Sequence, residues 1–418
     1  MSWLSSTIRT PIIFRNRPFG LLWTGQLLSS VGSWLLLVAV PVYVFHLTGS
    51  TRDTGLTVVA EVLPMLVFGP AAGVCADRWP RLRIMIGSNL LGAASVSALM
   101  LVSSRSQLWL VLLAIFTENA GAAFFSPAYS GVVPALVGRG QDLNAANAWS
   151  SFAGGAVRIA GAPLGGALYT LGGFRLPVAI DAGTYLASAG LVAAISILAP
   201  PAAPPPAVAS GLRGVAADLR AGVSALHADR VLAMLLFASS LFLLGNGALT
   251  ALLVPYVVGD LGAKAASLGG LYCALGAGFL VSAYLGRRAS ASLRLRSWAV
   301  GLLVTETAAF AGLFNVHHFV LAFPFIGLVG VAGGAFLMLE RTTIQRRAPD
   351  HVVGRISSAY STVVMAATLG GALVASLIAA WAGRTAALNL AIGIVALGAV
   401  AAARLPGTAA AAPAPASA

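Results

Sequence analysis

The chain has 418 residues, of which 58% are hydrophobic and 9% are charged, and its mean hydropathy is +0.90. A soluble domain usually carries about 25% charged residues, so this composition excludes a soluble protein and predicts helices that are solvated by a bilayer. The net charge of +13 does not indicate a nucleic-acid partner, because the basic residues lie in short breaks between apolar runs rather than on one basic face.

Long apolar runs recur along the chain and predict transmembrane helices. About 20 helical residues are needed to cross a hydrocarbon core of about 30 Å, and most of the runs reach this length. The runs therefore predict an all-α membrane protein with twelve transmembrane helices. The predicted spans are 18–46, 54–76, 84–104, 107–131, 144–170, 177–198, 231–258, 265–286, 297–315, 318–340, 355–380 and 385–404.

The basic residues predict the orientation of these spans. Twelve spans place both ends of the chain on the same side of the membrane. If that side is the cytoplasm, 19 of the 25 Lys and Arg residues lie there, 5 lie on the opposite side, and Arg158 lies inside a span. Cytoplasmic loops carry an excess of Lys and Arg. The split predicts a multi-pass protein of the cell inner membrane with both termini in the cytoplasm.

The segment between the sixth and seventh spans divides the chain into halves. Residues 199–208 are rich in proline and cannot continue a helix. We therefore expect two six-helix bundles at 1–198 and 231–405, a cytoplasmic linker at 199–230 and a disordered tail at 406–418. Within the linker, apolar residues recur at the spacing of an amphipathic surface helix: Leu212, Val215, Leu219, Val223 and Leu226.

A short repeat supports this division. The five residues from Leu164 to Leu168 recur identically from Leu369 to Leu373, at an offset of 205 residues, which is close to half of the chain. The two copies fall in the fifth and eleventh spans, which correspond if the halves are related. Two parallel repeats with a site between them are an architecture of transporters.

The loop between the second and third spans carries the sharpest motif. It contains Gly73, Asp77, Arg78 and Arg81 and resembles the Gly-x-x-x-Asp-Arg-x-Gly-Arg-Arg signature of the major facilitator superfamily, with Pro80 in place of the second glycine. The resemblance implies the major facilitator fold, with two pseudo-symmetric six-helix bundles. It also implies that Gly73 permits close helix approach and that the aspartate and arginines form a conformational latch.

Two further stretches resemble the drug and siderophore exporter branch of this superfamily, which includes enterobactin and macrolide efflux proteins. One stretch runs from Phe14 to Phe19, and the other runs from Phe125 to Asn147. The fifth span also carries a pattern similar to the antiporter motif of exporters, although its proline is displaced by one position. The alternative is an ordinary helix-packing face of small residues. This pattern consists of Gly161, Pro163, Gly165 and Gly166.

Ionisable residues inside the predicted spans are candidates for function, because each costs about 2.5–3.5 kcal/mol to insert. Glu118 and Arg158 lie near mid-membrane on consecutive spans, which predicts an ion pair that a proton or a substrate could open. The alternative is a permanent structural pair. Glu61 is a second candidate proton acceptor or a water-exposed carboxyl. Glu306 and Asp181 lie on spans that are peripheral in the superfamily, so we expect structural roles for them.

These patterns predict a secondary active transporter that exports a small hydrophobic molecule, such as a drug or a siderophore, by proton antiport through alternating access. The alternative is a proton-independent facilitator, an importer or a lipid carrier of the same fold. We expect no enzyme activity, no metal and no cofactor, because the spans carry no nucleophile motif and no metal-ligand spacing. The expected partners are a small-molecule substrate, protons and the lipid bilayer, and the expected oligomeric state is a monomer.

Overall fold

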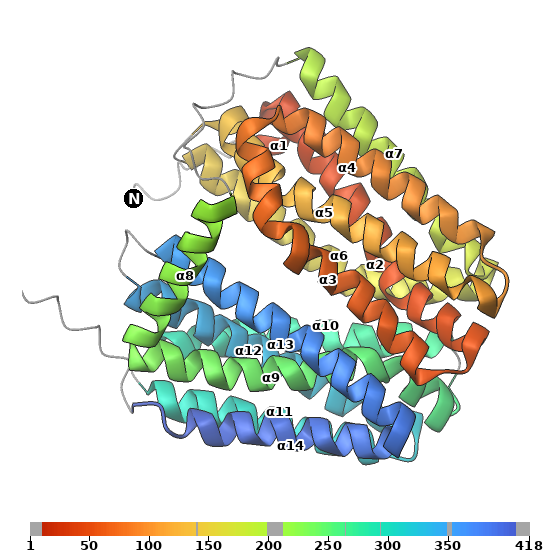
Figure 1. Ribbon diagram of the computed structural model, residues 1–418, viewed down its shortest axis with the longest axis vertical. Coiled ribbons are helices and arrows are strands. Elements are labelled where there is room, and N and C mark those ends of the chain that lie inside the picture. Colours follow the sequence, from red (N-terminus) through yellow and green to blue (C-terminus); the bar gives the residue numbers. More distant parts are fainter. Residues whose placement is uncertain are drawn as a thin grey trace, which may run out of the picture. The chain divides into compact units, whose positions relative to one another are not determined.

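The computed structural model describes residues 11–138, 141–198, 212–263, 265–292, 294–348 and 353–406, and these ranges are helical without a β-strand (Figure 1). The predicted all-α class is therefore confirmed. The long helices are α2 (Arg17–Thr48), α3 (Thr51–Arg78), α4 (Arg81–Ala98), α5 (Leu108–Val137), α6 (Gln141–Gly172), α7 (Arg175–Leu198), α9 (Arg230–Val254), α10 (Ala265–Ala291), α11 (Leu295–Asn315), α12 (Ala322–Arg347), α13 (Val353–Ala382) and α14 (Arg384–Ala402).

Two shorter α-helices, one π-helical turn and three 3-10 turns (Leu99–Leu101, Arg105–Gln107 and Phe319–Leu321) complete the described part of the chain. Helix α1 (Ile12–Arg15) precedes α2, and α8 (Leu212–Ala228) lies within the predicted linker. The π-helix Pro255–Asp260 follows α9, where proline interrupts the α-helical hydrogen bonds. The proline-rich residues 199–208 and the predicted tail from 407 onward lie outside the described residues.

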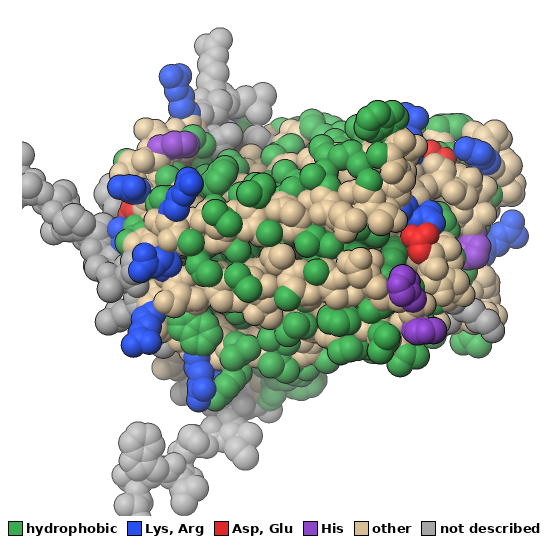
Figure 2. Space-filling view, turned by 90° about the horizontal axis from the view of Figure 1, so that it is seen from below, with side chains coloured by type: hydrophobic (Ala, Val, Ile, Leu, Met, Phe, Trp, Pro, Cys, Tyr) green, Lys and Arg blue, Asp and Glu red, His purple; other side chains and the backbone are tan. Residues whose placement is uncertain are grey.

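Ten of the helical segments in the described part of the chain are long and apolar enough to cross a membrane. Helices α3 and α6, which contain two further predicted spans, are not among the ten, so the count of twelve stays a prediction. On the face shown in Figure 2, hydrophobic side chains form a broad band, and charged side chains, Lys and Arg among them, lie at both ends of it. An apolar band between two charged ends is typical of a membrane protein.

The helices group into two compact units. Unit 1 consists of residues 1–37 and 67–210, and unit 2 consists of residues 38–66 and 211–418. The end of α2 and most of α3 therefore group with the second unit, whereas the sequence analysis placed all of residues 1–198 in one bundle. The predicted division into two six-helix bundles stays a prediction.

In unit 1, α4 packs along both α5 and α7. Small residues allow these close contacts. A Cβ atom at Gly92 of α4 would lie 2.8 Å from the Tyr185 ring of α7. One turn away, Asn89 of α4 donates a hydrogen bond of 3.0 Å to the Ser188 hydroxyl. Tight packing and buried hydrogen bonds replace the hydrophobic effect as the force between helices in a membrane.

In unit 2, α9 packs along α13, and α10 packs along α12. Glycines form both contacts: a Cβ atom at Gly371 of α13 would lie 1.8 Å from the Leu244 carbonyl oxygen, and one at Gly278 of α10 would lie 2.1 Å from the Gly327 carbonyl oxygen. Helix α8 joins this unit through Leu226, which is fully buried among side chains that include Tyr360 of α13.

Candidate functional site

The candidate site in unit 1 is a cluster of buried polar side chains from α2, α5 and α7. The Tyr185 hydroxyl of α7 donates a hydrogen bond of 3.0 Å to Oε1 of Glu118 on α5. The same hydroxyl lies 3.2 Å from the Ser33 hydroxyl of α2. Tyr185 therefore links three helices of the unit through one oxygen atom.

Asp181 brings a second carboxyl group to this cluster. It lies one turn before Tyr185 on α7, is fully buried, and interacts electrostatically with Glu118. Its Oδ1 accepts a hydrogen bond of 3.2 Å from the Thr184 hydroxyl, while Oδ2 has no hydrogen-bond partner in the described structure. Gly32 of α2 makes room for this carboxyl, because a Cβ atom there would lie 2.0 Å from Oδ1.

The structure places the three predicted coupling residues differently. Glu118 belongs to the cluster in unit 1. The side chain of Arg158 lies outside the described residues, so its ion pair with Glu118 stays a prediction. Glu61 belongs to unit 2, where it lies on α3 within electrostatic reach of the Tyr272 hydroxyl of α10. The sequence analysis expected a structural role for Asp181 and did not anticipate its proximity to Glu118.

The structure describes some of the side chains of the latch motif and not others. Arg81 donates hydrogen bonds to two carbonyl oxygens, that of Ala76 at the end of α3 (3.1 Å) and that of Gly131 on α5 (3.0 Å). It thus satisfies a carbonyl group that the end of α3 leaves without a helical partner. Arg78 is exposed, and the side chain of Asp77 lies outside the described residues.

The close helix approach that we expected at Gly73 is not seen in this structure. A Cβ atom at this position would meet no described heavy atom within 4 Å. The latching role of the motif stays a prediction.

The antiporter-like pattern lies on α6, with Pro163 inside the helix. Gly161 and Gly165 face α2 across a short distance: a Cβ atom at Gly161 would lie 2.5 Å from the Trp34 Cβ, and one at Gly165 would lie 2.4 Å from the Leu35 carbonyl oxygen. Gly166 is buried. The pattern therefore lies on a closely packed surface, and its role in coupling stays a prediction.

The two stretches that resemble the exporter branch contact each other in unit 1. The Asn16 amide donates a hydrogen bond of 2.8 Å to the carbonyl oxygen of Leu136, and its side-chain oxygen accepts one of 3.0 Å from the Phe19 backbone N–H. Arg15 forms an ion pair with Asp142. These contacts hold the start of α2 against the end of α5 and the start of α6.

Unit 2 contains two buried carboxyl groups with different surroundings. Glu340 of α12 accepts a hydrogen bond of 2.7 Å from the Ser239 hydroxyl of α9, which accepts one of 2.6 Å from Tyr360 of α13. Glu306 of α11 is 1% exposed, and its carboxyl group lies beside the Asn246 side chain of α9 and the Gly333 backbone of α12. The sequence analysis missed Glu340 because it directly precedes Arg341, at the polar end of a predicted span.

The described residues provide no site for a metal ion. Among them, no group of three His, Cys, Asp or Glu side chains comes together as metal binding would require. The chemistry that the unit 1 cluster can support is the binding and release of a proton or of a polar group of a substrate.

Comparison with known proteins gives a family match over most of the chain. The family model described as Major Facilitator Superfamily matches residues 22–372. The multidrug efflux pump Tap of Mycolicibacterium fortuitum is 28% identical over 411 residues, covering 93% of this chain and 95% of Tap. The enterobactin exporter EntS of Escherichia coli is 27% identical over 383 residues, covering 88% of each protein.

A more similar relative matches over a shorter region. Macrolide efflux protein A of Streptococcus pyogenes is 39% identical over 121 residues, which cover 28% of this chain and 30% of that protein. This chain therefore matches less than a third of the length of that relative.

Solved structures share the fold. A bacterial homologue of the human lysosomal transporter Spinster, crystallised in an inward-facing and unoccupied conformation, has a TM-score of 0.75 at 14% identity and covers 93% of this chain and 96% of its own. A bacterial homologue of the iron transporter ferroportin, in an inward-facing state, has a TM-score of 0.72 at 18% identity, with coverages of 92% and 98%. Identities this low show the fold alone.

Proposed function

The chain belongs to the Major Facilitator Superfamily, and from this premise we propose that it exports a small hydrophobic molecule, drug-like or siderophore-like, by proton antiport through alternating access. The family match shows that the chain is a transporter rather than an enzyme, and relatives named as an efflux pump and an exporter support export as the direction of transport. The predicted family resemblance and fold class are thereby confirmed. The coupling ion and the class of substrate are the proposed part.

The observation that carries proton coupling is the pair of carboxyl groups in unit 1. Glu118 and Asp181 interact electrostatically on neighbouring membrane helices, and Tyr185 donates a hydrogen bond to one of them. Ionisable side chains at such positions are costly and mark ion or proton pathways in transporters. We propose that this pair binds a proton from one side of the membrane and releases it to the other.

The names of the relatives support the substrate class. Two similar proteins are named as a multidrug efflux pump and an enterobactin exporter, and a third is named for macrolide efflux. Different substrates on one fold require a pocket whose shape is set by side chains rather than by the fold itself. We propose a hydrophobic compound with a polar group as the substrate, and a monomer as the transporting unit.

The distribution of basic residues supports the proposed location. We place the protein in the cell inner membrane with both termini in the cytoplasm, because 19 of 25 Lys and Arg residues then lie in cytoplasmic segments. In this orientation α4 begins and α5 ends at the cytoplasmic surface. Export then runs from the basic side of the protein to the opposite side.

Transport into inverted membrane vesicles tests the proposal. The vesicles are energised by respiration, offered a panel of fluorescent lipophilic cations and neutral drugs, and then treated with a protonophore. We expect accumulation of at least one compound, loss of that accumulation with the protonophore, and loss of coupling in a Glu118→Gln variant. The matched control is Glu306→Gln, which changes another buried membrane carboxyl that lies outside the cluster.

Three results would contradict the proposal in different ways. Accumulation that persists after the protonophore would indicate another driving ion, whereas uptake that only reaches the external concentration, with or without the protonophore, would indicate a facilitator. Full protonophore-sensitive export by Glu118→Gln would keep proton antiport but remove Glu118 from the coupling site.

A further inference from the structure

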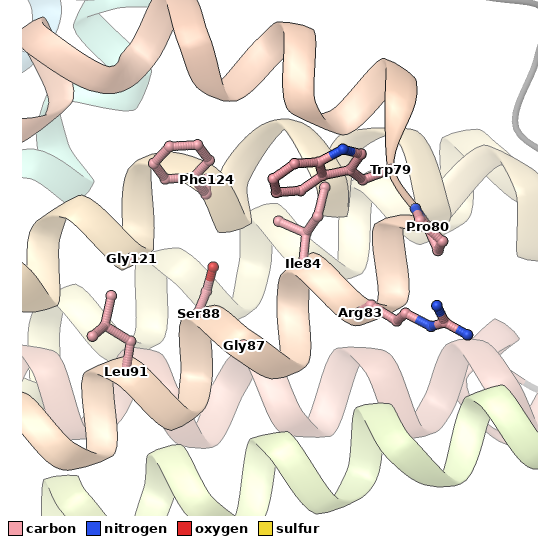
Figure 3. A pocket seen from close by; sticks show the side chains of 9 residues that line it. All are labelled: Trp79, Pro80, Arg83, Ile84, Gly87, Ser88, Leu91, Gly121 and Phe124. Carbon is pink, nitrogen blue, oxygen red and sulfur yellow. The ribbon is translucent and has the colours of Figure 1, made fainter.

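A groove in unit 1 lies apart from the carboxyl cluster, between the end of α3, the first half of α4 and α5. Its volume is about 560 Å³, within the range of small-molecule sites. Figure 3 shows Trp79, Pro80 and Arg83 at one end, and Leu91 and Phe124 at the other. The groove therefore has a polar end and an apolar end.

The wall of the groove is one face of α4. Its lining residues include Arg83, Gly87 and Leu91, at spacings of four, which places them on the same side of a helix. The eight residue steps from Arg83 to Leu91 span about 12 Å along the axis. One leaflet of a hydrocarbon core is about 15 Å thick, so the groove has the length of one leaflet.

The floor and the opposite wall are closed by packing. A Cβ atom at Gly121 of α5 would lie 3.1 Å from the Ser88 carbonyl oxygen, so α4 and α5 touch along the floor. On the other side, the ring centroids of Phe124 and Phe68 of α3 are 6.2 Å apart. Gly87 keeps the space between these walls open, because a Cβ atom there would meet no described heavy atom within 4 Å.

The polar end of the groove carries the positive charge of Arg83, which has no intramolecular partner among the described residues. The Arg83 side chain is exposed and makes no hydrogen bond or ion pair within the described part of the chain, whereas the Arg81 side chain, two residues earlier, donates to two carbonyl oxygens. Beside Arg83, Trp79 is 61% exposed. An exposed tryptophan and an arginine next to an apolar surface are typical of the level of the lipid headgroups.

We propose that this groove binds an anionic phospholipid, with the headgroup phosphate at Arg83 and an acyl chain along Ile84, Gly87 and Leu91. Charge complementarity and the match between groove length and leaflet thickness select this occupant. The proposal is independent of proton coupling. It relies on the proposed orientation only for naming the leaflet, which is the cytoplasmic one.

Quenching of Trp79 fluorescence by brominated lipids tests the proposal. The full chain is reconstituted in phosphatidylcholine bilayers that contain either brominated phosphatidylglycerol or brominated phosphatidylcholine at the same fraction. The signal of Trp79 is the difference between the wild type and a Trp79→Phe variant. We expect about fivefold stronger association of the anionic lipid, which corresponds to about 1 kcal/mol per basic residue near an anionic surface.

Two variants and a matched control locate the site. Arg83→Gln, at an exposed position, should remove the preference for the anionic lipid while quenching by both lipids remains. Gly87→Phe should fill the groove and reduce quenching by both lipids. Gly190→Phe on α7 is the control, since a Cβ atom there also meets no described atom within 4 Å and the residue lies outside the groove.

Three results would overturn the proposal. The first is equal quenching of the wild type by both lipids. The second is an anionic preference that survives Arg83→Gln, a variant that does not depend on how well Gly87→Phe folds. The third is relief of quenching by a transported drug at constant lipid composition, which would assign the groove to substrate entry instead of a lipid.

Discussion

The contact between α9 and α13 gives a sharp prediction from two adjacent glycines. A Cβ atom at Gly371 would lie 1.8 Å from the Leu244 carbonyl oxygen, whereas one at Gly370 would meet no heavy atom of the described residues within 4 Å. Ordinary contact begins at 3.4 Å, so Gly371→Ala must move the helices apart by about 1.6 Å at this point. The same two helices are also close at Gly247 on α9, where a Cβ atom would lie 2.0 Å from the Thr368 carbonyl oxygen.

The expected magnitude follows from comparing the two variants. Both replacements gain about 1 kcal/mol of helix propensity, so this gain cancels in the difference between them. Overpacking costs about 1–3 kcal/mol. We therefore expect Gly371→Ala to have a free energy of unfolding about 1–3 kcal/mol lower than that of Gly370→Ala, which should equal or exceed the wild type.

Unfolding in mixed micelles with increasing sodium dodecyl sulfate, followed by tryptophan fluorescence, measures this difference. Gly370→Ala is the matched control, since it lies on the same helix and differs only in the side that it faces. Equal unfolding midpoints for the two variants would refute the close approach of α9 and α13.

Three further predictions concern other contacts. Arg81→Gln should lower the free energy of unfolding by about 1.5–3 kcal/mol in the same titration, because two charged hydrogen bonds to carbonyl oxygens are lost; an effect no larger than that of Arg83→Gln would contradict this. Glu306→Gln should leave stability unchanged or raise it, because a buried amide costs less to desolvate than a carboxylate and its oxygen still offers an acceptor to Asn246 and the Gly333 backbone; a clear loss of stability would contradict this. Gly55→Leu should push α3 and α13 apart at Ser376, because the new Cβ atom would lie 1.7 Å from the Ser376 hydroxyl oxygen. A cysteine at position 376, in a background without other cysteines, should then react several-fold faster with a thiol reagent. An unchanged rate would argue against this packing.

The sequence predicted the fold class well because membrane helices have a strong compositional signal. Every backbone polar group in the hydrocarbon core must be satisfied within its own segment, so long apolar runs and helices coincide. The predicted span 231–258 corresponds to α9 and its π-helical turn, which together cover 230–260. The amphipathic spacing from Leu212 to Leu226 likewise corresponds to α8.

The sequence predicted less about which side chains meet. Glu118 was identified as a candidate because it is an acid within an apolar run, but its contact with Tyr185 depends on how α5 and α7 rotate against each other. Rotation is set by small residues such as Gly92, whose contact with the Tyr185 ring no local pattern reveals. Asp181 was assigned a structural role because its span is peripheral in the superfamily, and its proximity to Glu118 depends on the same packing.

The sequence also did not predict that Arg81 and Arg83 have separate roles. Arg81 and Arg83 have the same charge and lie two residues apart, so their side chains leave α4 in different directions. Arg81 reaches the Gly131 carbonyl oxygen, where a side chain at position 131 would collide with the guanidinium group. Arg83 is left exposed beside the groove.

The central claim is that export is coupled to proton movement through the carboxyl cluster, and one flux measurement tests it most directly. Inverted vesicles are acidified by respiration, respiration is stopped, and a transported compound is added while a dye reports the internal pH. The proposed antiport predicts that the compound accelerates proton efflux in the wild type and not in Glu118→Gln. Uptake of the compound by the wild type without any change in proton efflux would contradict it.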